Sequence, residues 1–199
     1  MSVPSTVHAP TLADALFTRR SATNWRTDAL LVVGFSLFVA LTARISIELS
    51  FTPVPITGQT LGVLLTGALL GSRRGALALL VYLAEGAAGL PVFAGGAAGF
   101  ARLLGPTGGY LLAYPLAAGL VGLLAERGWD RSIWRAGMTM LLGNLLIYLI
   151  AVPWLSWFVG SLTLALAKGM LPFIVGDALK IALAAVALPG GWALLRRSL

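Results

Sequence analysis

Long apolar stretches alternate with short polar or glycine-rich connections along most of this chain. A helix that crosses a lipid bilayer needs about 20 apolar residues. Several stretches reach that length, whereas the second and third are short enough to be tilted or broken. The candidate helices cover residues 30–49, 60–70, 76–90, 110–125, 133–155 and 171–195. The pattern therefore predicts an all-α integral membrane bundle of six helices.

The composition of the chain agrees with a membrane protein. Of its 199 residues, 58% are hydrophobic and 11% are charged, and the mean hydropathy is +0.92, which excludes an ordinary soluble domain. The polar connections are short, so we expect one transmembrane domain over residues 29–199. Residues 1–28 are polar and hold the single histidine, His8. We expect them to be a cytoplasmic segment before a retained first helix, because the first apolar run is too late and too long for a signal peptide.

Basic side chains concentrate on alternate connections, and this asymmetry predicts the topology. Arg102 and Lys168 fall on one side of the predicted membrane. The ten that fall on the other side are Arg19, Arg20, Arg26, Arg73, Arg74, Arg127, Arg131, Arg135, Arg196 and Arg197. Both termini should therefore be cytoplasmic in the inner (plasma) membrane, with the connections 50–57, 91–108 and 156–170 outside. The net charge of +7 then reflects topology and anionic lipid head groups rather than nucleic acid.

The stretch FTPVPITGQTLGVLLTGALLG, residues 51–71, joins a proline-rich turn to a glycine-rich apolar helix. Pro53 and Pro55 fix φ and bias the preceding residue towards extended geometry, so residues 52–57 cannot be helical and should cross the end of the bundle. Small residues at four-residue spacing in the following helix are typical of close helix packing in membranes. The stretch suggests a ligand cap, with a packing helix after an ordinary loop as the alternative. Its uncharged hydrogen-bonding groups are Thr57, Gln59 and Thr60.

The segment 86–109 is the longest candidate for a non-helical connection. Its glycines, which include Gly95 and Gly96, suit a re-entrant or capping loop whose bare backbone groups contact a ligand. A flexible surface loop is the alternative. The leucine, valine and phenylalanine residues of the segment favour the packed, capping form.

Charged side chains inside the apolar runs cost about 2.5 to 3.5 kcal/mol each on insertion scales, so each needs a partner or a task. Arg44 and Glu48 lie four residues apart, and we interpret them as a local ion pair, with a ligand role as the alternative. Glu85 should reach the interface. Asp177 and Lys180 share one face of the last helix. They indicate either a structural ion pair or a substrate site, since one carboxylate and one ammonium can together bind a small polar group.

The chain lacks the residues that several classes of function require. The chain has no cysteine, which removes disulfides, thiolate nucleophiles and cysteine metal sites. It has no G-x-x-x-x-G-K-[ST] phosphate loop, so ATP hydrolysis would come from other polypeptides. With only the Asp177 and Lys180 pair in the apolar runs as possible machinery, we expect no enzyme, catalytic residue, metal or cofactor. An autonomous ion- or proton-coupled carrier stays open, because paired charges in a helix also serve relays.

Three strings in the sequence resemble BioY, the biotin-specific substrate-capturing (S) component of energy-coupling-factor (ECF) transporters. They are PVPITGQTLGVLLTGALLGSRRGALALLVYLAEGAAGLPVFAGG, LLGPTGGYLLAYPLAAGLVG and PFIVGDALK. The resemblance implies a six-helix bundle that captures biotin from outside, capped by the loops after the first and third helices. It also implies coupling to a transmembrane T component and two cytoplasmic ATPase subunits. The acid-and-lysine pair of the family's last helix corresponds to Asp177 and Lys180.

Biotin carries hydrogen-bonding and charged groups that this pair can bind. Asp177 can accept the ureido N–H groups, whereas Lys180 can donate to the ureido carbonyl or attract the carboxylate, and the sequence leaves both roles open. Arg102 is a second candidate partner for the carboxylate. Aromatic candidates for the apolar middle of biotin are Tyr82, Tyr110, Trp154 and Trp157. The substrate-binding residues that we predict are Asp177, Lys180, Thr57, Gln59, Gly95, Gly96, Arg102 and Tyr110.

The resemblance also implies a small-xxx-small motif on the first helix for docking to the T component. This motif is only partly present, as Ser36 and Ala40, with Arg44 at the next step. We therefore expect the docking face to include Ser36 and Ala40.

Overall fold

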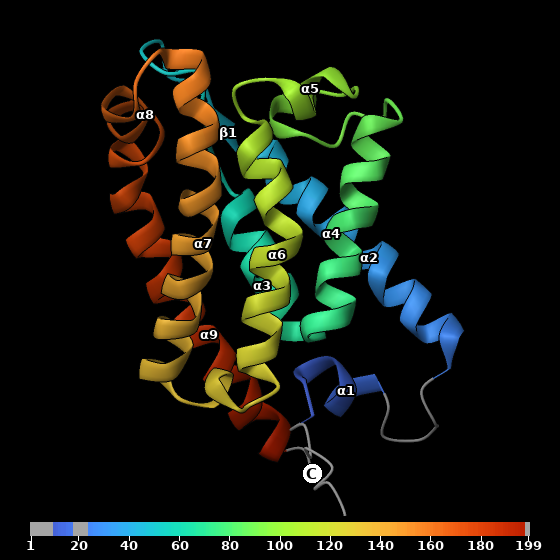
Figure 1. Cartoon of the computed structure of the whole chain (residues 1–199). Helices are drawn as coiled ribbons and strands as arrows, with labels where there is room; N and C mark the ends of the chain where they lie inside the picture. The colour runs from blue at the N-terminus through green and yellow to red at the C-terminus, as the bar shows by residue number, and fades with distance from the viewer. Residues whose placement is uncertain (1–9, 18–23, 198–199) are drawn as a thin grey trace, which may run out of the picture.

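The computed structural model describes residues 10–17 and 24–197, which form a bundle of helices (Figure 1). His8, Arg19 and Arg20 lie outside the described residues. The longer helices are α2 (Trp25–Arg44), α3 (Gln59–Leu70), α4 (Ser72–Ala87), α6 (Gly108–Ala125), α7 (Ile133–Val159) and α9 (Ile174–Arg197). The short elements are α1 (Leu12–Phe17), α5 (Ala101–Leu104), α8 (Leu162–Gly169), the 3₁₀ turns η1 (Ala94–Gly96), η2 (Trp129–Arg131) and η3 (Leu171–Phe173), and the strands β1 (Ser46–Ile47) and β2 (Ile56–Thr57).

The helices confirm the predicted all-α fold of a multi-pass membrane protein. Within the described residues, four segments are long and apolar enough to cross a membrane: α2, α6, α7 and the run from α8 to α9 over Leu162–Arg197. Helix α3 is apolar but has only 12 residues. The count of six spans and the cytoplasmic side of the termini stay predictions.

The first long helix differs from the predicted one at its C-terminal end. Helix α2 ends at Arg44, and the chain continues into β1, which pairs with β2 in antiparallel register so that Ser46 faces Thr57. Glu48 therefore lies beyond the helix, and the predicted helical pairing of Arg44 with Glu48 is wrong. Arg44 instead donates a hydrogen bond from Nη2 to the carbonyl of Pro91, at 2.7 Å. Pairing between strands overrides the apolar pattern that continues past Arg44.

The connection expected at residues 156–170 is largely helical. Helix α7 extends to Val159, where Gly160 adopts a left-handed conformation with φ +90° and ends it. Ser161 then caps α8 by accepting a hydrogen bond from the backbone N–H of Leu164, at 3.2 Å. A helix ends readily at a glycine with positive φ and begins readily at a capping serine.

The core of the bundle forms around α6, which packs against α3, α4 and α7, while α9 packs on α7. Small residues allow these helices to approach closely. A Cβ atom added to Gly67 on α3 would lie 2.2 Å from the carbonyl oxygen of Ala118 on α6, and one added to Gly62 would lie 2.4 Å from Oγ1 of Thr42 on α2. The glycines of α3 therefore serve helix packing on two sides, as small residues do in membrane bundles.

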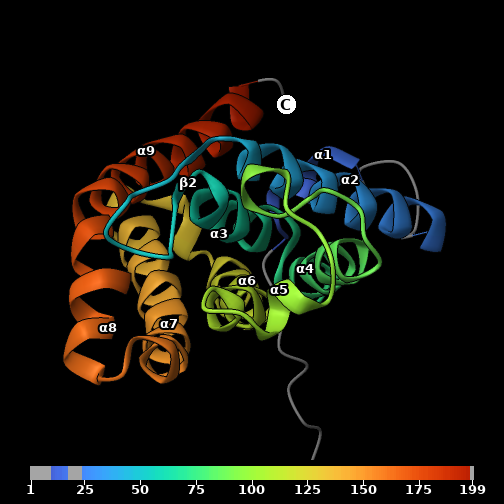
Figure 2. The ribbon, with the colours of Figure 1, turned by 90° about the horizontal axis from the view of Figure 1, so that it is seen from above.

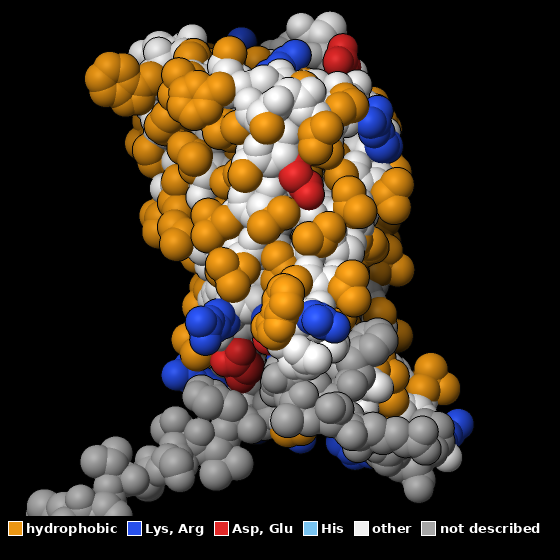
Figure 3. All heavy atoms as spheres, turned by 90° about the vertical axis from the view of Figure 1, so that its right-hand side faces the viewer, with side chains coloured by type: hydrophobic (Ala, Val, Ile, Leu, Met, Phe, Trp, Pro, Cys, Tyr) orange, Lys and Arg blue, Asp and Glu red, His pale blue; other side chains and the backbone are white. Residues whose placement is uncertain are grey.

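The lateral surface of the bundle is apolar, as lipid contact requires. Figure 3 shows hydrophobic side chains over most of one face, with charged side chains mainly towards its two ends. Exposed side chains of α2 on this surface include Leu30, Leu37 and Leu41. Exposed tryptophans occur at the start of α2 and of α7, and Trp157 near the end of α7 is 90% exposed. Tryptophans at both ends of membrane helices are typical of the two membrane interfaces.

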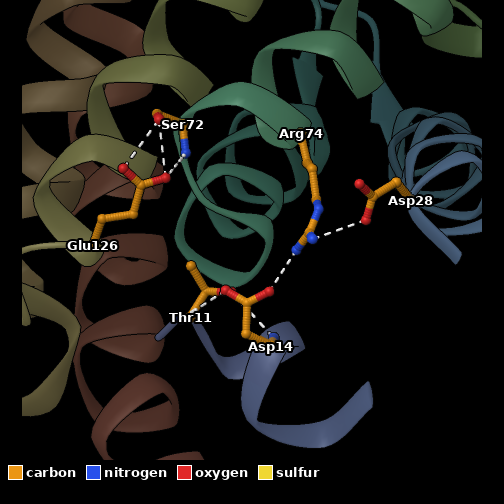
Figure 4. A network of polar contacts seen from close by, with 6 residues as sticks. All are labelled: Thr11, Asp14, Asp28, Ser72, Arg74 and Glu126. Carbon is orange, nitrogen blue, oxygen red and sulfur yellow. Dashed lines mark hydrogen bonds and ion pairs between the residues drawn. The ribbon is translucent and has the colours of Figure 1, made fainter. Parts of the chain in front are cut away.

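A polar network closes the end of the bundle at which α1 and the end of α9 lie (Figures 1 and 4). Arg74 of α4 forms ion pairs with Asp14 of α1, at 2.6 Å, and with Asp28 of α2, at 2.8 Å. Beside it, the carboxylate of Glu126 accepts a hydrogen bond from the backbone N–H of Ser72, at 2.7 Å. A carboxylate at a helix N-terminus satisfies free N–H groups and complements the helix dipole. The network thus joins α1, α2, α4 and the end of α6.

Candidate functional site

A cavity of about 500 Å³ lies near the opposite end of the bundle from this network. Figure 2, viewed from above, shows the segments around β2 and α5 crossing over the ends of the long helices. The cavity is lined by residues of the segment 46–60, of the segment 93–97, and of α5, α6, α7 and α9. Its volume falls in the usual range of small-molecule pockets. Residues 52–57 are non-helical, as the prolines predicted.

The structure brings all eight of the predicted substrate-binding residues to this cavity. Asp177 and Lys180 come from α9, Thr57 and Gln59 from the start of α3 and the strand before it, and Tyr110 from α6. The remaining three, in the segments that cross the bundle end, are Gly95, Gly96 and Arg102. Residues far apart in the sequence thus converge on one place. Their contact with a ligand stays a prediction.

The acidic residue of the pair is held from two sides. Asp177 is 5% exposed, and its Oδ1 lies 3.3 Å from Nζ of Lys180. The hydroxyl of Tyr148, on α7, donates a hydrogen bond to Oδ2. Lys180 also donates to Oγ1 of Thr60 on α3, at 2.8 Å. These contacts satisfy a buried carboxylate and a partly buried ammonium and fix both next to the cavity, because a buried charge without partners is costly.

A second polar group on the lining is the amide of Gln59, which is 3% exposed. Its Nε2 donates to the hydroxyl of Tyr82, and this hydroxyl donates to the carbonyl of Val92, at 3.0 Å. The Oγ1 of Thr57 lies 3.4 Å from Oε1 of Gln59. The amide is therefore oriented by α4 and by the segment that follows α4.

The predicted aromatic residues divide into one that reaches the cavity and three that do not. Tyr110 lines the cavity and donates from its hydroxyl to the carbonyl of Gly169. Tyr82 is fully buried behind Gln59, Trp154 donates to the carbonyl of Gly105 at 2.9 Å, and Trp157 points outward. The prediction that these three pack on the ligand is not supported, because their hydrogen bonds and exposure assign them to packing and to the interface.

Sequence reasoning missed several aromatic and apolar lining residues. Tyr148 is the most important of them, because it binds the carboxylate of Asp177. Apolar runs rich in leucine and alanine gave no signal for which aromatic side chains would face inward. Outside the segment 46–60, the missed aromatic and large apolar lining residues are Phe93, Leu111, Tyr114, Ile147, Tyr148 and Phe173.

The two crossing segments are anchored by specific hydrogen bonds. Thr52 donates from Oγ1 to the carbonyl of Lys168, at 2.8 Å, which ties the first segment to α8. In the second segment, the backbone N–H of Phe93 donates to the carbonyl of Ala97, at 3.0 Å. Gly95 and Gly96 between them have φ of +65° and +83°, values that favour glycine. This turn brings the bare backbone of both glycines to the cavity.

The residues predicted to dock a partner lie away from the exposed face of α2. Ser36 is fully buried, and its Oγ lies 3.0 Å from Oε1 of Glu85 on α4 and 2.8 Å from the carbonyl of Val33. Ala40 is partly buried. Glu85, expected to reach the interface, is half-buried and accepts this hydrogen bond.

Together these features define a membrane-embedded protein with a cavity whose lining is part polar and part apolar. A sequence model described as the BioY family matches residues 16–197. The chain belongs to this family.

The relatives that match the chain cover most of its length. It is 47% identical over 152 residues to a protein named probable biotin transporter BioY from Pyrococcus horikoshii. The aligned residues cover 76% of this chain and 89% of that relative. It is 36% identical over 167 residues to biotin transporter BioY from Rhizobium etli, covering 80% of this chain and 89% of the relative. A crystal structure of the S-component for biotin from an ECF-type ABC transporter matches with a TM-score of 0.75, at 29% identity, over 85% of this chain and 93% of that one.

Proposed function

We propose that this chain captures biotin as the substrate-specific component of an ECF-type uptake transporter. The observation that carries the proposal is the convergence of Asp177, Lys180 and the other six predicted residues on one cavity. The similar proteins named biotin transporters, and the similar structure of a biotin S-component, support it.

The acid-and-lysine pair suits the ureido ring of biotin. Asp177 presents carboxylate oxygens, which accept the two ureido N–H groups, and hydrogen bonds to a charged acceptor are stronger than neutral ones. Lys180 lies beside it and donates to the ureido carbonyl in this arrangement. Tyr110, Tyr114 and Phe173 supply aromatic surface on the lining for the thiophane ring and the valeryl chain.

Arg102 of α5 is our candidate for the carboxylate of biotin. It lines the same cavity but comes from a segment that crosses the bundle end, whereas Asp177 and Lys180 belong to a long helix. A guanidinium can bind a carboxylate through two parallel hydrogen bonds. This assignment leaves Lys180 for the ureido end.

The proposal includes partners and a location. A T component and two cytoplasmic ATPase subunits would supply the energy, since the sequence has no phosphate loop. Six spans in the inner (plasma) membrane, with residues 1–28 and both termini in the cytoplasm, would place the cavity on the outer side among membrane lipids. Docking through Ser36 and Ala40 would require α2 to shift, because Ser36 is fully buried.

An autonomous ion- or proton-coupled carrier is the second candidate. One observation favours it, because Tyr148, Asp177 and Lys180 form a connected chain of hydrogen bonds between α7 and α9. Such chains of polar groups inside a membrane bundle also serve proton relays.

The proposal is tested by saturation binding of radiolabelled biotin to the full chain in lipid nanodiscs. We expect high-affinity binding without ATP hydrolysis, displaced by biotin and far less by an analogue methylated on both ureido nitrogens. Absence of saturable binding would contradict the proposal. Biotin accumulation by liposomes that contain this chain alone, driven by an ion gradient, would favour the carrier.

A further inference from the structure

Arg44, the last residue of α2, contacts the segment that covers the cavity. Its Nη2 donates a hydrogen bond to the carbonyl of Pro91, at 2.7 Å. A Cβ atom added to Gly96 would lie 2.8 Å from Nη1 of the same guanidinium. One side chain thus binds the start of this segment and lies close to its glycine turn. We refer to residues 91–97 as the 91–97 loop.

The 91–97 loop forms part of the cavity lining, whereas Arg44 is not among the described lining residues. The loop contributes residues 93–97 to the lining. Arg44 therefore acts on the cavity through the loop. A contact of this kind leaves the chemistry of the lining unchanged and alters only where the loop lies.

The end of α2 is also where the other crossing segment begins. Strand β1 starts two residues after Arg44, and the backbone N–H of Gly58 donates to the carbonyl of Ile45, at 3.0 Å. The guanidinium thus connects the 91–97 loop to the point at which the segment 46–57 is anchored. Both segments that cross the cavity meet at this end of α2.

Two further polar contacts hold α2 against α4, the helix that precedes the 91–97 loop. Ser36 lies in hydrogen-bonding contact with Glu85, and Asp28 pairs with Arg74. Helix α2 is therefore held against α4 at two positions along the helix. These contacts fix the place from which Arg44 reaches the 91–97 loop. Within the loop, Gly95 has open space around it, since a Cβ atom added there would meet nothing within 4 Å.

We propose that Arg44 is a positioning residue that holds the 91–97 loop over the cavity and so slows release of the bound molecule. The inference rests on the proposed function for the identity of that molecule, biotin, but not for the loop contact. Loss of the guanidinium removes a charge-assisted hydrogen bond at an exposed position. The expected effect is therefore a moderate increase in the release rate, about threefold to tenfold.

The test compares the full chain in nanodiscs with Arg44→Gln, Arg44→Lys and the control Arg73→Gln, an exposed arginine at the other end of the bundle. Preloaded radiolabelled biotin is diluted into unlabelled biotin and its release is followed. We expect faster release from Arg44→Gln, an association rate that is not reduced, and unchanged discrimination against the ureido-methylated analogue. Arg44→Lys should release biotin more slowly than Arg44→Gln but faster than the wild type, since an ammonium keeps a hydrogen-bond donor. Release from Arg44→Gln at the wild-type rate would overturn the inference.

Hydrogen exchange of the ligand-free chain tests the loop contact without biotin. We expect backbone amides of residues 92–97 to exchange faster in Arg44→Gln than in the wild type and in Arg73→Gln. Unchanged exchange would overturn the inference. If the wild type failed to bind biotin, the proposed function would fall, and the exchange comparison would still decide whether Arg44 holds the loop.

The two glycines of the turn provide a double-mutant test. Gly96→Ala forces a Cβ against the guanidinium, whereas a Cβ at Gly95 meets nothing within 4 Å, and both positions have positive φ. Both substitutions therefore strain the backbone, but only the first displaces Arg44. We expect the effects of Gly96→Ala and Arg44→Gln on release to be less than additive, and those of Gly95→Ala and Arg44→Gln to be additive. Additive effects in both pairs would contradict the proposal that Arg44 positions the loop at Gly96.

Discussion

Tyr148 donates a hydrogen bond to Oδ2 of Asp177, on the carboxylate whose Oδ1 pairs with Lys180. The two residues lie on different helices, α7 and α9, and they meet at the cavity. The tyrosine thus fixes the orientation of the carboxylate. Orientation of a binding group before the ligand arrives reduces the entropy that binding costs.

Replacement of Tyr148 by phenylalanine should therefore weaken biotin binding while keeping the aromatic ring. A hydrogen bond to a charged group contributes about 1.5 to 3 kcal/mol, and the ligand's own N–H groups replace part of it, so we expect a loss of about threefold to tenfold in affinity. Isothermal titration of the folded variant measures this. Unchanged affinity would show that Asp177 keeps its orientation without the tyrosine.

Replacement of Asp177 by asparagine probes the ureido contact directly, because it keeps the shape and replaces one acceptor oxygen with a donor. We expect a loss of about 1.5 to 3 kcal/mol, or roughly tenfold to a hundredfold in affinity. Lys180→Met should also weaken binding, partly because it leaves Asp177 without its ion pair.

Selectivity separates a ligand contact at Asp177 from a structural ion pair. If the carboxylate reads the ureido group, Asp177→Asn should lose preference for biotin over the ureido-methylated analogue. A change confined to protein yield, with unaltered affinity in the folded fraction, would remove Asp177 from the binding site.

The sequence best predicted the structural features that depend on residues close together along the chain. Apolar runs located the long helices, and the spacing of Asp177 and Lys180 predicted a pair that the structure shows at 3.3 Å. The prolines at 53 and 55 predicted the non-helical segment over the bundle end. Each of these features depends on neighbouring residues, so a single sequence carries it.

Contacts between distant segments were not predictable in the same way. Tyr148 and Asp177 are 29 residues apart, and Arg44 and Pro91 are 47 apart. The early end of α2 depends on the pairing of β1 with β2, which no periodicity within α2 indicates. The same holds for Ser36, because its burial follows from how α2 packs on α4. Tertiary contacts decide such details.

The predicted topology can be tested with single cysteines at Ala98 and Ser132, since the chain has none of its own. Both residues are exposed; Ala98 lies between η1 and α5, in a segment that crosses the cavity end of the bundle, and Ser132 is the N-cap residue of α7. The concentration of basic residues around Ser132 predicts a cytoplasmic position for it. A membrane-impermeant thiol reagent should label only the Ala98→Cys variant in intact cells and both variants in opened membranes. Equal labelling in intact cells would overturn the six-span arrangement.

The ion pairs of Arg74 predict a pH-dependent contribution to stability at the end of the bundle shown in Figure 4. Partial burial acts to raise the pKa of Asp14, but hydrogen bonds from Arg74 and Thr11 outweigh it and hold the pKa below the usual value of 3.8. A carboxyl with a lowered pKa in the folded state stabilises the fold above its unfolded pKa. This stability is lost as the pH falls from near 4 through the lower folded pKa.

Arg74→Gln should therefore lower the Tm of the detergent-solubilised chain at neutral pH, through a loss of about 1 kcal/mol for partly exposed ion pairs. The difference between wild type and variant should shrink as the pH falls from about 4 through the lowered folded pKa of Asp14, because the unfolded chain binds a proton first and the folded wild type loses its ionised carboxylate only at the lower pH. Arg73→Gln, at the exposed neighbouring position, is the matched control and should leave both the Tm and its pH dependence nearly unchanged. A Tm difference for Arg74→Gln that stays constant from neutral pH to pH 3 would show that the arginine stabilises this end by packing rather than through the Asp14 carboxylate.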